Sequence, residues 1–209
     1  EQCVKYLETY TYGQDEYDKL LEVLKDNKHP ILERPYLFTK LVSLSYDANE
    51  SPASFISNGD SNLDGMDGVI ESFVKREVRK WHNYDKETGL PYLTLDQHIE
   101  LLSNIALEMW NDQRNTMSIE MIQIIVSILL DKWSVEENRK PKITEMVKAH
   151  ALLVNVEGKS SLRKFDHDEF RNYFLSRALC DLMKKCIEEK SSQSFRNVFS
   201  KAQMPDAEA

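Results

Sequence analysis

Apolar and polar positions follow their clearest pattern over residues 151–187. Two short apolar runs, 152–156 and 162–165, flank a turn that contains Gly158, which is typical of a β-hairpin. After the second run, apolar residues recur at three- and four-residue spacing: Phe170, Phe174, Leu175, Ala178, Leu179, Leu182, Met183, Cys186 and Ile187. This spacing predicts a long amphipathic helix that begins near Asp166 and buries one face.

The earlier part of the chain is patterned for helices. Pro35 opens one of them, because proline is favoured in a first helical turn, and the pair Thr94 and Gln97 forms a capping-box pattern. Ser118 precedes a segment that is apolar almost all round, which predicts a helix buried on most sides. The expected helices cover about 4–10, 17–24, 35–44, 69–81, 94–114, 119–130 and 143–149.

These elements predict a mostly α protein, in which a helical bundle is followed by a winged-helix-like unit with a short β-hairpin at about 152–165. We expect a small helical domain over 1–46 and a loop with a linking helix over 47–93. A winged-helix-like domain is expected over 94–190, followed by a polar tail over 191–209.

The string FDHDEFRNYFLSRAL at 165–179 resembles the F-x-H-x-x-F-x-x-Y-F-x-A segment that closes the winged-helix region of NACHT-type STAND signalling NTPases. The matching letters are Phe165, His167, Phe170, Tyr173, Phe174 and Ala178. In that family the histidine contacts the phosphates of bound ADP and keeps the switch off, so the resemblance implies this role for His167. Judged from the residues alone, His167 could equally be a first-turn residue that makes local contacts.

The string ERPYLFTKLVSL at 33–44 is similar to the proline-led helix that follows the nucleotide-binding domain of the same family. There the proline packs against the adenine ring, which is the role implied for Pro35. Proline at a helix start is also common where no ligand binds. The order of the two strings, with the proline-led helix first, is that of the family.

The resemblance therefore implies a nucleotide-sensing, autoinhibitory module of an immune or antiphage signalling switch. Its expected partners are an upstream nucleotide-binding domain that holds ADP or ATP and, once the switch opens, further copies of the parent protein. The parent is expected to be an ATPase. This chain contains no G-x-x-x-x-G-K-[ST] string, so we expect no catalytic residue and no cofactor in the chain itself.

Composition limits the alternatives. The formal net charge of -8 opposes non-specific binding to nucleic acid or to an anionic membrane. A DNA-binding winged helix needs a basic recognition helix, but 143–149 offers only Lys148, with Lys140 and Lys142 just before it. No apolar run approaches the roughly 18 residues of a membrane span, and no signal peptide is evident. Cys3, Cys180 and Cys186 have no metal-ligand spacing, so we expect a reducing cytoplasm.

Two weaker metal motifs remain as alternatives. Asp60, Asn62, Asp64, Gly65 and Glu71 match the calcium-loop pattern D-x-[DN]-x-[DN]-G-x5-E. Asp67 occupies its usual aliphatic position and no second hand is present, so an acidic loop that caps the next helix is the competing interpretation.

The second metal motif consists of His150, His167, Asp168 and Asp181, which faintly suggest the ligands of helical metal-dependent phosphohydrolases. In that family the His-Asp pair lies within a helix, whereas here it follows a predicted strand. We therefore assign no metal ligands from the sequence.

Overall fold

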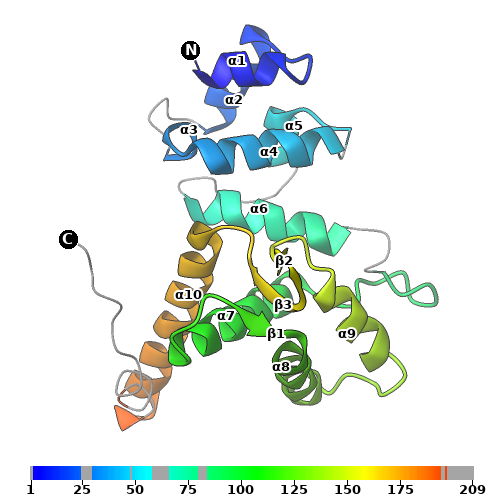
Figure 1. Cartoon of the computed structure of the whole chain (residues 1–209), viewed down its shortest axis with the longest axis vertical. Coiled ribbons are helices and arrows are strands. Elements are labelled where there is room, and N and C mark those ends of the chain that lie inside the picture. The colour runs from blue at the N-terminus through cyan, green and yellow to red at the C-terminus, as the bar shows by residue number, and fades with distance from the viewer. Residues whose placement is uncertain are drawn as a thin grey trace. The chain divides into compact units, whose positions relative to one another are not determined.

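The computed structural model describes residues 2–24, 30–47, 49–57, 66–79, 84–193 and 196. Within these ranges the chain has ten helices and a three-stranded antiparallel sheet, which confirms the predicted mostly α class with a short hairpin. The chain forms two compact units, Glu1–Arg76 and Glu77–Ala209. The division falls inside helix α6, Met66–Arg79, and Figure 1 labels the elements of both units.

The first unit is helical. It contains α1 (Gln2–Glu8), α2 (Gln14–Leu24), α3 (Pro30–Glu33), α4 (Pro35–Asp47), α5 (Pro52–Ser57) and most of α6. Helix α2 packs against α1 and α5, and α4 packs against α1, α3 and α5. The largest side chains that are fully buried in this unit include Leu7, Leu20, Ile31, Leu37, Leu41, Phe55, Ile56 and Phe73. The helix starting at Pro35 is confirmed, whereas α3 was not expected.

Helix α5 corrects the expectation that the segment 47–93 begins with a loop. Pro52 occupies the first turn of α5, where its missing N–H has no helical partner to lose. The Ser51 hydroxyl accepts a hydrogen bond from the Ser54 N–H at 3.2 Å, and Phe55 and Ile56 are buried. A helix this short gives too few apolar repeats to be recognised by periodicity. The calcium-motif residues 60–65 lie outside the described residues.

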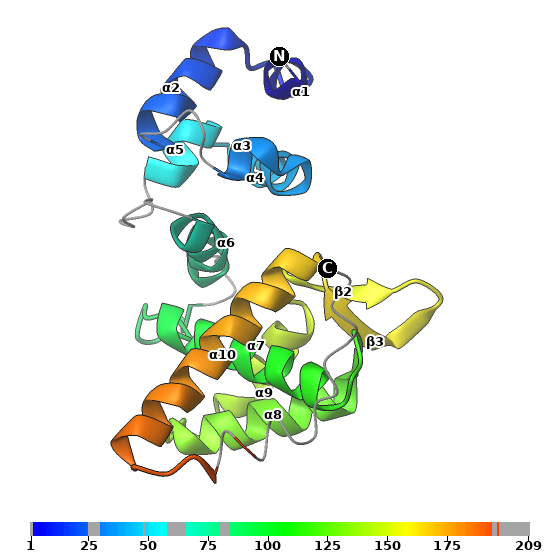
Figure 2. The same ribbon diagram turned by 90° about the vertical axis from the view of Figure 1, so that its left-hand side faces the viewer.

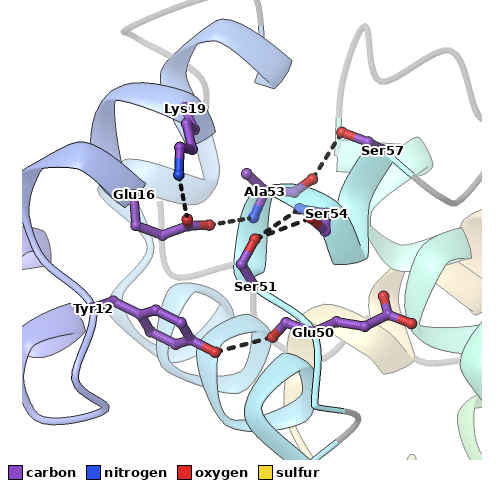
Figure 3. A network of polar contacts seen from close by, with 8 residues as sticks. All are labelled: Tyr12, Glu16, Lys19, Glu50, Ser51, Ala53, Ser54 and Ser57. Atoms are coloured by element: carbon purple, nitrogen blue, oxygen red, sulfur yellow. Dashed lines mark hydrogen bonds and ion pairs between the residues drawn. The ribbon is translucent and has the colours of Figure 1, made fainter.

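A buried carboxylate joins α2 to the start of α5. Glu16 is 6% exposed, and its Oε1 accepts a hydrogen bond from the Ala53 N–H at 2.9 Å. The Lys19 ammonium lies 3.9 Å from Glu16 Oε2, and the Tyr12 hydroxyl donates to the Glu50 carbonyl at 3.0 Å nearby (Figure 3). The carboxylate thus satisfies a backbone donor in the first turn of α5, where negative charge is favoured.

We expect Glu16→Ala to lower the free energy of unfolding of the first unit by about 1–3 kcal/mol, because it leaves the buried Ala53 N–H without its acceptor. Glu16→Gln should cost less, since the amide oxygen can still accept. Urea unfolding followed by circular dichroism measures both. Glu22→Ala, on the exposed side of α2, is the control and should stay within about 0.5 kcal/mol. Equal effects at the two glutamates would contradict the capping role.

The second unit places a small sheet among helices. It contains α7 (Leu95–Asn111), β1 (Met117–Ser118), α8 (Ile119–Lys132), α9 (Lys140–Lys148), β2 (Leu153–Val156), β3 (Lys159–Phe165) and α10 (Asp168–Glu188). The strand order is β1-β3-β2. This sequence of helix, strand, two helices, hairpin and closing helix is winged-helix-like, and Figure 2 shows the β2–β3 hairpin projecting from the helices. Helix α10 packs along α7.

Local signals in this unit form as predicted. The Thr94 hydroxyl accepts from the Gln97 N–H, and the Gln97 side chain accepts from the Thr94 N–H at 2.9 Å, which completes the capping box of α7. The Ser118 hydroxyl accepts from the Met121 N–H at 3.2 Å. The hairpin turns tightly through Gly158, whose φ of +71° suits glycine. Strand β1 was not expected, because two residues carry no periodic pattern.

Two helices bury less than their sequences predict. Helix α8 buries Ile122, Val126, Leu129 and Leu130 but leaves Ile124 53% and Ile128 62% exposed, so the expectation that it is buried on most sides is wrong. In α10 the buried residues are Phe170, Phe174 and Ala178, whereas Met183 and Ile187 are exposed. Apolar periodicity shows which positions can be buried, but it cannot show how far the neighbouring helix extends.

Candidate functional site

The start of α10 fixes His167 in a defined orientation. His167 is the N-cap residue, and its Nδ1 accepts a hydrogen bond from the Glu169 N–H at 3.2 Å. A neutral imidazole whose Nδ1 is an acceptor carries its proton on Nε2. The flanking Phe165 and Phe170 are both buried, which holds the strand-to-helix connection in place. His167 therefore has the local capping role.

A cavity of about 310 Å³ opens at this helix start. It is lined by Asn115, Lys164, Phe165, Asp166, His167, Asp168 and Arg171. Lys164 comes from β3. Arg171 follows His167 by one helical turn, so His167 and Arg171 lie on the same side of α10. The helix N-terminus adds a positive partial charge. Cationic side chains, an imidazole and a helix start are the groups that bind phosphate in proteins.

Arg171 is held by two neighbours in this cavity. One of its terminal nitrogens donates to the Asn115 side-chain oxygen, and the other lies 3.5 Å from Asp168 Oδ1. Asp168 is 73% exposed in its side chain, so its carboxylate can turn into solvent. The sequence alone did not indicate Lys164, Arg171 or Asn115 as site residues. The position of Arg171 four residues after His167 was a usable signal, but Asn115 lies 56 residues from Arg171 in sequence.

Pro35 lies in the first turn of α4 with an exposed side chain. The Phe38 N–H donates to the Arg34 carbonyl at 3.0 Å, so the helix begins where the sequence predicted. Pro35 belongs to the unit Glu1–Arg76 and His167 to the unit Glu77–Ala209. The adenine contact of Pro35 stays a prediction.

Most of the residues that match the family segment have a packing role. Phe165, Phe170, Phe174 and Ala178 are buried, and the rings of Phe165 and Phe174 stack with centroids 5.9 Å apart. Tyr173 is partly exposed and meets Phe174 edge-on at 5.1 Å. Of the matching residues, Phe165 and His167 line the cavity. The string thus describes how α10 packs, with one residue suited to ligand binding.

A buried polar group in the second unit escaped sequence analysis. His98 on α7 and His150 are both 3% exposed, with ring centroids 5.4 Å apart. His150 Nδ1 accepts from the Leu152 N–H at 3.1 Å, and Glu77 Oε2 accepts from the Ala151 N–H at 3.3 Å. The sequence alone does not show that His98 is buried, because a histidine on α7 could equally face solvent.

His150 is therefore a core residue, and it does not line the cavity at His167. Over the ranges that the structure describes, no group of three or more His, Cys, Asp or Glu side chains could hold a metal ion. His150, His167, Asp168 and Asp181 are accordingly not assembled as the ligand set of a phosphohydrolase.

The basic residues of α9 are largely neutralised by acidic neighbours. Lys140 Nζ lies 2.6 Å from Asp131 Oδ1 and also contacts Glu137, and these hydrogen bonds raise the pKa of Lys140. Lys148 Nζ lies 2.7 Å from Glu145 Oε1. Each pairing reduces the attraction of this helix for a nucleic-acid backbone. In the described part of the chain, no helix is both long and apolar enough to cross a bilayer.

Comparison with known proteins does not assign a function to the chain. No protein-family model, no curated protein and no solved structure matches the chain. We take the cavity at the start of α10 as the candidate site, because it combines two basic side chains, an oriented histidine and a helix N-terminus, with Asp166 and Asp168 beside them.

Proposed function

We propose that this chain is the nucleotide-sensing and autoinhibitory module of a NACHT-type STAND NTPase. In this proposal an upstream P-loop domain of the same protein holds ADP, and the cavity at the start of α10 receives a phosphate of that ADP. The observation that carries the proposal is the position of His167, whose Nδ1 caps α10 and whose side chain lines the cavity at the helix start. The winged-helix-like order of elements supports it.

The proposed mechanism is a switch based on differential binding. A hydrogen bond from His167 to an ADP phosphate stabilises the closed state, in which the nucleotide joins the upstream domain to this module. Exchange of ADP for ATP moves the phosphates and removes that contact, so the open state becomes favoured. A ligand shifts such an equilibrium only by its differential affinity for the two states. The opened cytoplasmic parent then self-associates, and its ATPase activity resets it.

The nucleotide content of the natural protein tests the proposal. We expect the full-length protein, purified without added nucleotide, to release ADP on heat denaturation, because the closed state retains it. Chromatography of the released nucleotide measures the amount per chain. The control is the same protein with its P-loop lysine replaced by alanine, which should contain little ADP. A natural protein that has no P-loop before this chain, or that contains no nucleotide, would contradict the proposal.

A further inference from the structure

The acidic and basic residues around His167 differ in how firmly they are placed. Arg171 is partly buried, with a side-chain exposure of 23%, and the exposed Asn115 accepts a hydrogen bond from it. Asp168, its ionic partner on the same helix turn, is mostly in solvent. Arg171 is therefore held at the cavity by Asn115, whereas the Asp168 carboxylate can leave at little cost. Asp166, the second carboxylate that lines the cavity, is half-buried.

We infer that Lys164 and Arg171 complete a phosphate-binding site with His167, in which Arg171 is the principal anchor and Asp168 is a competing internal anion. This inference deepens the proposed function, on which its biological meaning depends. The ligand class is a phosphate or diphosphate group, bound by side chains from β3 and α10. Arginine suits this role, because its planar guanidinium can donate two parallel hydrogen bonds to one phosphate.

The role of Asp168 follows from the same geometry. Its carboxylate oxygen lies 3.5 Å from the Arg171 nitrogen, a position that a phosphate oxygen would take. An incoming phosphate must displace this carboxylate, which turns into solvent. Asn115 keeps the guanidinium in place during the exchange, because its side-chain oxygen accepts from a different nitrogen of Arg171. Removing the charge of Asp168 should therefore strengthen phosphate binding.

The test uses the full chain with inorganic phosphate and pyrophosphate as probes, at constant ionic strength adjusted with sodium chloride. Two-dimensional NMR follows the amides of Asp168 and Glu169 and the ring of His167. We expect saturable shifts at millimolar probe, with pyrophosphate bound more tightly because it carries more charge. Sodium sulfate is the third probe and reveals whether the site selects for charge alone.

The variants make the inference specific. Arg171→Gln should weaken pyrophosphate binding about tenfold or more, since it removes charge-assisted hydrogen bonds. Lys164→Gln should weaken it by a smaller factor, whereas Asp168→Asn should strengthen it about two- to fivefold. Arg177→Gln changes the net charge equally but lies outside this cavity, so it should leave the affinity unchanged. Amide spectra of each variant show whether the fold is retained, and Lys164→Gln serves if Arg171→Gln does not fold.

Several results would overturn the inference. They are the absence of saturable shifts, equal weakening by Arg171→Gln and Arg177→Gln, and weaker binding in Asp168→Asn. The outcome is separable from that of the proposed function. A chain that binds pyrophosphate through Arg171, within a natural protein that contains no ADP, would keep the site and lose the switch. If the ADP content of the natural protein depends on His167 but not on Arg171, the switch is kept and the role of Arg171 as the anchor is lost.

Discussion

Replacement of His167 by alanine should speed ADP release from the natural protein roughly 10- to 100-fold and raise its basal signalling. The imidazole donates one charge-assisted hydrogen bond to a phosphate in the proposed closed state, worth about 1.5–3 kcal/mol. Each 1.4 kcal/mol corresponds to about a factor of ten in affinity. Stopped-flow displacement of a fluorescent ADP analogue measures the release rate, and a signalling assay without trigger measures the basal activity.

The capping role of His167 requires a variant that separates helix stability from ligand binding. His167→Asn keeps a good N-cap acceptor but lacks the Nε2 donor, so it should release ADP quickly without loss of stability. His167→Ala should also lower the free energy of unfolding by about 1 kcal/mol. Ser118→Ala is the matched control, because it removes the N-cap of α8 in the same unit and should leave ADP release unchanged.

His150→Ala is a poor histidine control, although His150 does not line the cavity at His167. His150 is buried beside His98, so its replacement would disturb the core and could alter ADP release indirectly. If His167→Asn releases ADP as slowly as the natural protein, His167 is only a helix cap and the family-based role fails.

The sequence indicates the centre of the candidate site but not its surroundings. His167 was found because a specific string frames it, and its place at the helix start follows from the hairpin before it and the apolar stripe after it. Asn115 could not be found, because it reaches the site only when β1 pairs with β3. Lys164 and Arg171 looked like ordinary polar residues on the exposed sides of a strand and a helix.

The same contrast holds for the fold. Long elements and side-chain caps were predictable, since the Thr94 and Ser118 caps depend on residues within one turn. Helix α5 begins with a local signal, Ser51 followed by Pro52. The hydrogen bond from Ala53 to Glu16 joins residues 37 positions apart in sequence, and no local pattern indicates such a contact. The prediction that α8 is buried on most sides failed for a related reason. The exposure of Ile124 depends on which helices pack nearby, and the sequence of α8 does not show this.

Replacement of Phe174 by alanine should lower the free energy of unfolding of the second unit by about 3–5 kcal/mol, the usual cost of removing a fully buried aromatic ring. Phe174 is 0% exposed, stacks on Phe165 at 5.9 Å and contacts Tyr173 at 5.1 Å. Urea unfolding followed by tryptophan fluorescence is selective for this unit, because Trp81, Trp110 and Trp133 all lie within residues 77–209.

Met183→Ala is the control on the same helix, since Met183 is 50% exposed and should change stability by no more than about 0.5 kcal/mol. Comparable effects at Met183 and Phe174 would contradict the observed end of the buried face at Ala178. In the natural protein, Phe174→Ala should also speed ADP release, but only together with a loss of stability, because it loosens the strand-to-helix connection that orients His167. His167→Asn should speed release without that loss. The pair of variants therefore separates the letters of the FDHDEFRNYFLSRAL string that maintain the fold from the one that contacts the nucleotide.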